Sequence, residues 1–110
     1  MVDDAPFLIL GGELHNSSGS DLGYMEKNVW PGLRRLGGNC YLTPVYWECM
    51  EPEPEKYDFT LVDGVIEQAR REGVRLILLW FGLWKNGNSS YVPAWIKTNP
   101  DYFYMHGIDG

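Results

Sequence analysis

The sequence contains few cysteines and few histidines, and this shortage argues against metal and thiol chemistry. Among 110 residues there are two of each. Cys40 and Cys49 lie nine positions apart, and no further ligand residues stand at a spacing typical of a metal site. His15 and His106 are isolated in the sequence. We therefore expect two free thiols, no bound metal and no cofactor.

Basic residues are also scarce. Nine Lys and Arg stand against fifteen Asp and Glu, which gives a net charge of −6. A chain without a Lys/Arg cluster is a poor candidate for contacting phosphates. We therefore expect no nucleic-acid partner.

Long apolar runs are missing too. The longest covers residues 76–84 and is interrupted by Gly82. It is far shorter than the ~20 residues that a membrane-spanning helix needs, so no membrane partner is expected. The first four residues, M-V-D-D, are acidic, whereas a signal peptide begins with basic residues. No export signal is therefore expected, and the compartment stays unassigned.

Aromatic residues, by contrast, are abundant. They make up 15% of the chain and include five Trp and seven Tyr. Large rings fill protein cores, and they also line pockets for ligands with apolar faces, such as a sugar ring. Composition alone leaves both uses open. The length matches one small domain and is far below the ~250 residues of a closed (β/α)₈ barrel.

Short apolar runs alternate with amphipathic segments, and this alternation indicates an α/β fold. The apolar runs predict strands, and apolar residues at three- and four-residue spacing predict helices. Strands that alternate with helices favour a parallel sheet with right-handed crossovers. The predicted strands cover residues 6–10, 40–47 and 74–81, and the predicted helices cover residues 25–36, 60–72 and 93–98.

Proline and glycine mark expected irregularities in these elements. Pro31 should kink or split the first helix, because proline lacks an amide donor. Pro44 lies within a predicted strand, so we expect a bulge there or an early end to the pairing. Gly11 and Gly12 should close the first strand, and a tight turn or a close approach of two backbones explains them best.

The region around the second helix is strongly acidic. Residues 48–58 carry five carboxylates and two prolines, a composition that predicts a solvated loop. Thr60 and Asp63 have the spacing of a capping box at the start of the following helix. Gln68 falls on the polar side of that helix and should face water.

The candidate site lies where the strands end. In parallel α/β folds, ligands bind at the carboxyl ends of the strands. Carboxylates and amides hydrogen-bond to sugar hydroxyls, and indole faces pack on the C–H side of the ring. The residues at these ends therefore predict a carbohydrate subsite formed by Glu13, His15, Asn16, Tyr46, Trp47, Glu48, Trp80, Trp84 and Asn86.

Each of these features also has a structural interpretation. A Trp at a strand end serves either the core or a sugar platform. Glu48 and Glu51 form either a general acid/base pair or part of a solvated acidic face. Glu51 is equally well explained as a carboxylate that ties a loop by accepting backbone amides.

Four motifs now stand in order along the chain. They are G-G-E-L-H at residues 11–15, W-x-x-x-E-P at 47–52, Y-D-F with L-x-D at 57–63, and P-x-W-I at 93–96. Together they resemble the N-terminal part of the catalytic barrel of β-galactosidases in glycoside hydrolase families 35 and 42. The resemblance runs from Phe7 to about Phe103.

The resemblance implies the first three βα units of a (β/α)₈ barrel, so that residues 1–110 form a single partial barrel segment. It also implies a retaining mechanism on terminal β-galactosides, with glutamates at the ends of strands four and seven. Because this chain reaches strand three, both catalytic glutamates are expected beyond Gly110. Family 35 members commonly have Tyr in place of Pro44 and Asn in place of Glu48, which leaves the sugar preference open.

Two further hypotheses follow from the residues. Glu13 and Glu48 end adjacent strands, so they are candidates for the carboxyl pair ~5–5.5 Å apart that a retaining hydrolase needs. Alternatively, the chain is a small non-catalytic module that binds a carbohydrate or a protein. A three-stranded parallel sheet also leaves two open edges, and we expect self-association to cover them.

Overall fold

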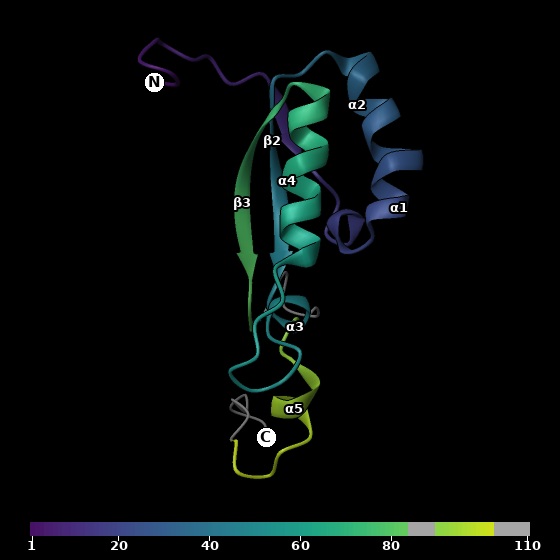
Figure 1. The fold of residues 1–110 in the computed structure, drawn as a ribbon, viewed down its shortest axis with the longest axis vertical. Helices are drawn as coiled ribbons and strands as arrows, with labels where there is room; N and C mark the ends of the chain where they lie inside the picture. Colours follow the sequence, from purple (N-terminus) through teal and green to yellow (C-terminus); the bar gives the residue numbers. More distant parts are fainter. Residues whose placement is uncertain (84–89, 103–110) are drawn as a thin grey trace, which may run out of the picture.

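The computed structural model describes residues 1–83 and 90–102, which form a three-stranded parallel sheet with helices packed against it (Figure 1). The strands are β1 (Gly11–Glu13), β2 (Cys40–Tyr46) and β3 (Arg75–Phe81). Their order is β1-β2-β3, and both pairings are parallel. The predicted parallel α/β fold is confirmed.

The first strand differs from the prediction. Residues 6–10 form no strand, and Leu8 is 75% exposed. The strand begins instead at the two glycines, because a Cβ at Gly11 would collide with the carbonyl oxygen of Cys40. The expected close approach of two backbones is thus confirmed, but it lies inside the strand. An apolar run indicates only that its side chains favour burial. A strand also needs a neighbouring backbone close enough for hydrogen bonds, and the pairing with β2 begins at Gly11.

The first helical segment is divided into three parts. Helix α1 (Leu22–Tyr24) is followed by a π-helical turn (Met25–Val29) and by α2 (Trp30–Leu36). The Asp21 carboxylate accepts a 2.8 Å hydrogen bond from the backbone N–H of Tyr24 and caps α1. Pro31 stands in the first turn of α2, where its missing amide is tolerated. The predicted split at this proline is confirmed.

Strand β2 passes through Pro44 without a bulge. Pro44 pairs with Leu79 in an unbroken register, so the expected bulge is wrong. The Leu42 carbonyl accepts a 2.9 Å bond from the N–H of Leu14, which places Leu42 on the β1 side. Alternate residues of a strand share one side of the ladder, so the missing amide of Pro44 faces the side where β1 has already ended. Pairing with β1 does therefore end early, as the proline predicted.

The acidic segment is not a loop throughout. It begins with the one-turn helix α3 (Trp47–Met50), and a loop then leads to α4 (Thr60–Glu72). The carboxylate of Asp58 accepts a 2.9 Å bond from the N–H of Thr60 at the start of α4. The predicted capping box is wrong, because Asp58 supplies the capping oxygen.

Two left-handed glycines end the main helices. Gly37 and Gly73 have φ angles of 69° and 70° and follow α2 and α4 directly. This conformation costs glycine little, which explains the stop at both positions. The last described helix, α5 (Ala94–Lys97), follows Pro93 as predicted.

The main core lies between the sheet and helices α2 and α4. Met25 and Trp30 pack there against Tyr41 of β2 and Val65 of α4. Gln68 is buried rather than solvated, which corrects the expectation. Its side-chain oxygen accepts a 2.8 Å bond from the Trp30 indole, and its amide nitrogen donates to a backbone carbonyl of α1.

The sheet edges remain open in the described part of the chain. Ile77 and Leu78 are 40% and 45% exposed. Because neighbouring residues of a strand point to opposite faces, β3 is partly uncovered on both faces of the sheet. A hollow of about 440 Å³ lies along β1 and another of about 300 Å³ lies beside β3 and α4.

Within residues 1–83 and 90–102, no helix is long and apolar enough to cross a membrane.

Candidate functional site

The three strands run in one direction, so their carboxyl ends face the same end of the molecule. Figure 1 shows α3, the loop after it and α5 gathered beyond the arrowheads of β2 and β3. This is the place where the strand ends predict a ligand site. The residues there come from two stretches, one following β2 and one following β3.

Strand β1 stops well before its neighbours. Glu13 pairs with Leu42, four residues before the end of β2 at Tyr46. At a rise of ~3.3 Å per residue, that leaves Glu13 about 13 Å short of the end of β2. Glu48 lies beyond that end, on α3. The register therefore does not support a retaining carboxyl pair formed by Glu13 and Glu48.

Tyr46 lies in the core beneath the site. It is 2% exposed, and its hydroxyl donates a 2.6 Å hydrogen bond to the backbone carbonyl of Asn16. Burial is the main reason that the pKa of Tyr46 rises to about 12. Tyr46 thus ties the loop after β1 to β2. In that loop His15 is exposed and Asn16 is partly buried.

A cluster of three rings supports the strand ends. Tyr46, Phe81 and Tyr91 have ring centroids 5.0–5.9 Å apart. The backbone of Tyr91 bridges two strand ends, since its N–H donates to the carbonyl of Gly82 and its carbonyl accepts from the N–H of Glu48 at 2.9 Å. Tyr91 was not predicted as a site residue, because nothing in its local sequence shows that the chain returns to β2.

Glu51 joins three segments of the site. One carboxylate oxygen accepts a 2.9 Å bond from the Trp47 indole and the other accepts a 3.0 Å bond from the backbone N–H of Glu55. The Glu51 backbone carbonyl accepts a further 2.9 Å bond from the Trp95 indole. The two donors at the carboxylate, the indole first, hold the pKa of Glu51 below its usual range. The interpretation of Glu51 as a loop-tying carboxylate is confirmed.

Two of the motifs behind the family resemblance meet at Glu51. W-x-x-x-E-P contributes Trp47 and Glu51, and P-x-W contributes Trp95. The two indole rings stand perpendicular, with centroids 6.4 Å apart, and Tyr102 packs edge-on against Trp95. The sequence offered Trp95 as a motif residue but gave no sign of its partner.

Glu48 presents an accessible carboxylate at this end of the sheet. Its side chain is 42% exposed and lies 3.9 Å from the Lys97 ammonium group. The neighbouring Cys49 has a raised pKa, mainly because of burial, so its thiol stays protonated. Both oxygens of the Glu51 carboxylate accept hydrogen bonds, from the Trp47 indole and the Glu55 backbone N–H, which favours a structural role for Glu51 over an acid/base role.

The remaining candidates divide by position. Trp80 is 58% exposed and precedes the last residue of β3. Trp84 and Asn86 lie outside the described residues. Within residues 1–83 and 90–102, no group of three His, Cys, Asp or Glu side chains could hold a metal ion.

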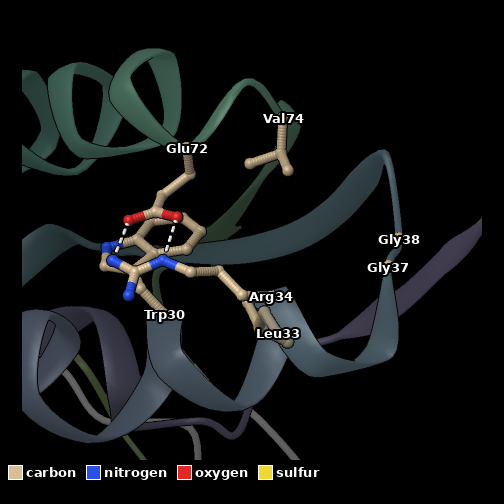
Figure 2. Close-up of a pocket in the computed structure, with 7 residues that line it drawn as sticks. All are labelled: Trp30, Leu33, Arg34, Gly37, Gly38, Glu72 and Val74. Atoms are coloured by element: carbon tan, nitrogen blue, oxygen red, sulfur yellow. Dashed lines mark hydrogen bonds and ion pairs between the residues drawn. The ribbon is translucent and has the colours of Figure 1, made fainter.

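A separate hollow lies at the opposite end of the sheet. It has a volume of about 220 Å³ and is lined by residues of α2 and α4 and by Gly37, Gly38 and Val74, which precede β2 and β3. Figure 2 shows these residues around the hollow. Arg34 and Glu72 face each other across it through paired hydrogen bonds, one of them 2.6 Å long. This ion pair lowers the pKa of Glu72 and raises that of Arg34. The hollow is remote from the carboxyl ends of the strands.

Comparison with known proteins places this geometry in context. A β-galactosidase family model, that of glycoside hydrolase family 42, matches residues 34–105. No curated protein matches the chain.

Two solved structures share the fold. The exo-β-1,4-mannosidase Op5Man5 from Opitutaceae bacterium strain TAV5 is 21% identical with a TM-score of 0.59, over 79% of this chain and 17% of its own. Endo-glycoceramidase II from Rhodococcus sp., solved as a lactosyl-enzyme intermediate, is 24% identical with a TM-score of 0.62, over 86% of this chain and 26% of its own. The chain thus spans about a quarter or less of these two relatives.

Proposed function

Because this chain belongs to the β-galactosidase family of glycoside hydrolase 42, we propose that it forms the sugar-binding start of a retaining glycosidase that acts on a terminal β-galactoside. The observation that carries the proposal is the Glu48 carboxylate. It is accessible at the carboxyl ends of the strands, next to Trp47 in sequence and 3.9 Å from Lys97.

The chemistry of this end suits a sugar ring. A carboxylate accepts hydrogen bonds from two neighbouring hydroxyls, and an ammonium group donates to a third. The exposed indole of Trp80 offers an apolar face for the C–H side of a ring. In this proposal Glu48 and Trp80 contact the sugar directly, and His15, Asn16, Trp84 and Asn86 extend the subsite.

Catalysis is proposed to need more of the barrel. A retaining mechanism uses two carboxyl groups ~5–5.5 Å apart. Glu13 is separated from Glu48 by the register, and Glu51 is held by Trp47 and Glu55. We therefore propose that both catalytic glutamates lie beyond Gly110, as the family resemblance implies, and that residues 1–110 alone do not hydrolyse glycosides.

The binding proposal is tested by titrating ¹⁵N-labelled chain with methyl β-galactoside and following the amide and indole signals. We expect shifts at Glu48 and at the Trp80 indole. The shifts should be lost in Glu48→Gln and kept in Glu67→Gln, a matched change at an exposed position of α4. Methyl β-mannoside serves as the competing sugar. Absence of any shift with either sugar would contradict the proposal.

The catalytic part is tested with an aryl β-galactoside. We expect no turnover above a mock purification. Turnover that disappears in Glu48→Gln would show that a working carboxyl pair lies within residues 1–110 and would overturn this part of the proposal.

We also propose that the isolated chain self-associates through its open edges. Ile77 and Leu78 on β3 and Leu8 before β1 are each at least 40% exposed. Exposed strand edges with apolar side chains favour pairing with another chain. Light scattering at micromolar concentration should show a dimer or a larger species, and a monodisperse monomer would contradict this.

A further inference from the structure

We infer that Glu51 is the positioning residue of this site: its carboxylate holds α3 and the following loop in place and so sets where the Glu48 carboxylate points. The inference rests on the proposed function for its sugar-binding consequence. Its structural part stands on hydrogen bonds between described residues.

Glu51 combines side-chain and backbone bonds at one point. Its carboxylate takes the Trp47 indole and the Glu55 amide, and its carbonyl takes the Trp95 indole. Its own N–H donates to the Trp47 carbonyl at 2.9 Å. Three segments, α3, the loop after it and α5, therefore meet at one residue.

The elements that meet at Glu51 are also the elements that border Glu48. Glu48 lies on α3 between Trp47 and Glu51, and its N–H is bonded to the Tyr91 carbonyl. Lys97, which approaches the Glu48 carboxylate, lies two residues after Trp95 on α5. Moving either helix would therefore move one of the two charged groups of the proposed sugar site.

A carboxylate is required because the helix it holds is short. Helix α3 has four residues, far too few to be stable alone, whereas the bond to Trp95 of α5 is accepted by the backbone carbonyl and does not depend on the side chain. Two carboxylate oxygens satisfy two donors at once. Glutamine offers one accepting oxygen and alanine offers none. The effect of substitution should therefore be graded, whereas an acid/base group or an ionic sugar ligand would be lost equally in both variants.

The first measurement is hydrogen exchange of the Trp47 indole, followed by ¹H–¹⁵N NMR of the full chain. We expect exchange to accelerate roughly tenfold or more in Glu51→Ala, with an intermediate change in Glu51→Gln, because a bond to a charged acceptor is lost. The Glu48 amide should shift in the same order. Trp47→Phe provides a second test, read from the Glu48 amide signal. It removes the indole donor to Glu51 and keeps an aromatic ring next to Trp95.

Glu72→Ala is the matched control, because it removes a carboxylate that bridges elements at the other end of the sheet. It should leave the Trp47 and Glu48 signals unchanged. In the galactoside titration, we expect Kd to rise roughly tenfold in Glu51→Ala, less in Glu51→Gln and not at all in Glu72→Ala.

The outcomes separate the two proposals. Unchanged Trp47 and Glu48 signals in Glu51→Ala would overturn the positioning role. Equal loss of sugar binding in both Glu51 variants, with these signals in place, would make Glu51 a direct ligand and also overturn it. Movement of the Glu48 signal in a chain that binds no sugar would support the positioning role and refute the proposed function.

Discussion

The two ends of the sheet are each bridged by a glutamate, but the bridges hold different things. At the amino end, Glu72 joins α4 to Arg34 of α2 by an ion pair (Figure 2). At the carboxyl end, Glu51 joins α3 and the loop after it through two neutral donors, the Trp47 indole and the backbone N–H of Glu55. How much each glutamate contributes to holding its helices depends on which other contacts those helices make.

At the amino end, the helices are already fixed by the core. Helices α2 and α4 contribute Trp30, Val65 and Ala69 to one buried cluster. Arg34 is largely exposed on its side of the ion pair, and exposed ion pairs contribute little to stability. Helices α3 and α5 contribute no residue to that cluster. Cys49 of α3 packs instead against the smaller cluster of Tyr46, Phe81 and Tyr91, and the hydrogen bonds at Glu51 join α3 to the loop and to α5.

The largest expected effect tests the claim about the amino end. Trp30→Ala removes a ring that is 1% exposed and should lower the free energy of unfolding by about 3–5 kcal/mol. Urea denaturation measures the change. Leu36→Ala, at an exposed position of the same helix, is the control and should change little. A small effect of Trp30→Ala would mean that the core does not hold this end.

A smaller effect is expected at the polar contact inside the same core. Gln68→Leu leaves the Trp30 indole N–H buried without an acceptor, which should cost about 1–3 kcal/mol. Urea denaturation again measures the change. Combining Gln68→Leu with Trp30→Phe removes both polar partners and should cost less than the sum of the single changes. Strict additivity would contradict the assigned hydrogen bond.

Between the two ends of the sheet, replacing Thr43 of β2 is expected to raise the stability of the fold. Its hydroxyl is buried and, within the described residues, has no hydrogen-bond partner. Thr43→Val replaces the hydroxyl by a methyl group of similar shape and should raise the free energy of unfolding by about 1 kcal/mol. Thermal and urea denaturation should agree on the sign, and a loss of stability would reveal a partner for the hydroxyl.

The subtlest expected difference lies in pH and salt. The pKa values of Glu51 and Glu72 are both lowered on folding, so each contributes stability above the ordinary glutamate pKa and loses it as the pH falls through the lowered value. Roughly 1 M salt shortens the screening length to about 3 Å, which weakens the attraction of the Arg34 and Arg71 charges for the Glu72 carboxylate. The pKa of Glu72 should then move toward its ordinary value, while that of Glu51, bonded to neutral donors, should stay lowered. Carboxyl ¹³C titrations measure both pKa values. If salt moved the two pKa values equally, the two bridges would not differ in their dependence on charge.

Much of the fold could be predicted from local patterns. Strands β2 and β3 and helix α4 follow from hydrophobic periodicity, and Pro31, Gly37 and Gly73 mark where helices divide or end. These features depend on backbone geometry within a few neighbouring residues. Strand β1 was misplaced because its start depends on the approach of Cys40, a residue far along the chain.

The candidate site shows the same division. The sequence was enough to predict that Trp47, Glu48 and Trp80 stand at strand ends, since alternating strands and helices imply a parallel sheet. It left the role of Glu51 open between catalysis and support.

Only the folded chain decided between these roles, by bringing Trp95 to Glu51 and Tyr91 to Glu48 across more than forty residues. The physical reason is that periodicity reports which way a side chain faces within its own element. The partner that satisfies a buried indole, amide or carboxylate is chosen by how separate elements pack.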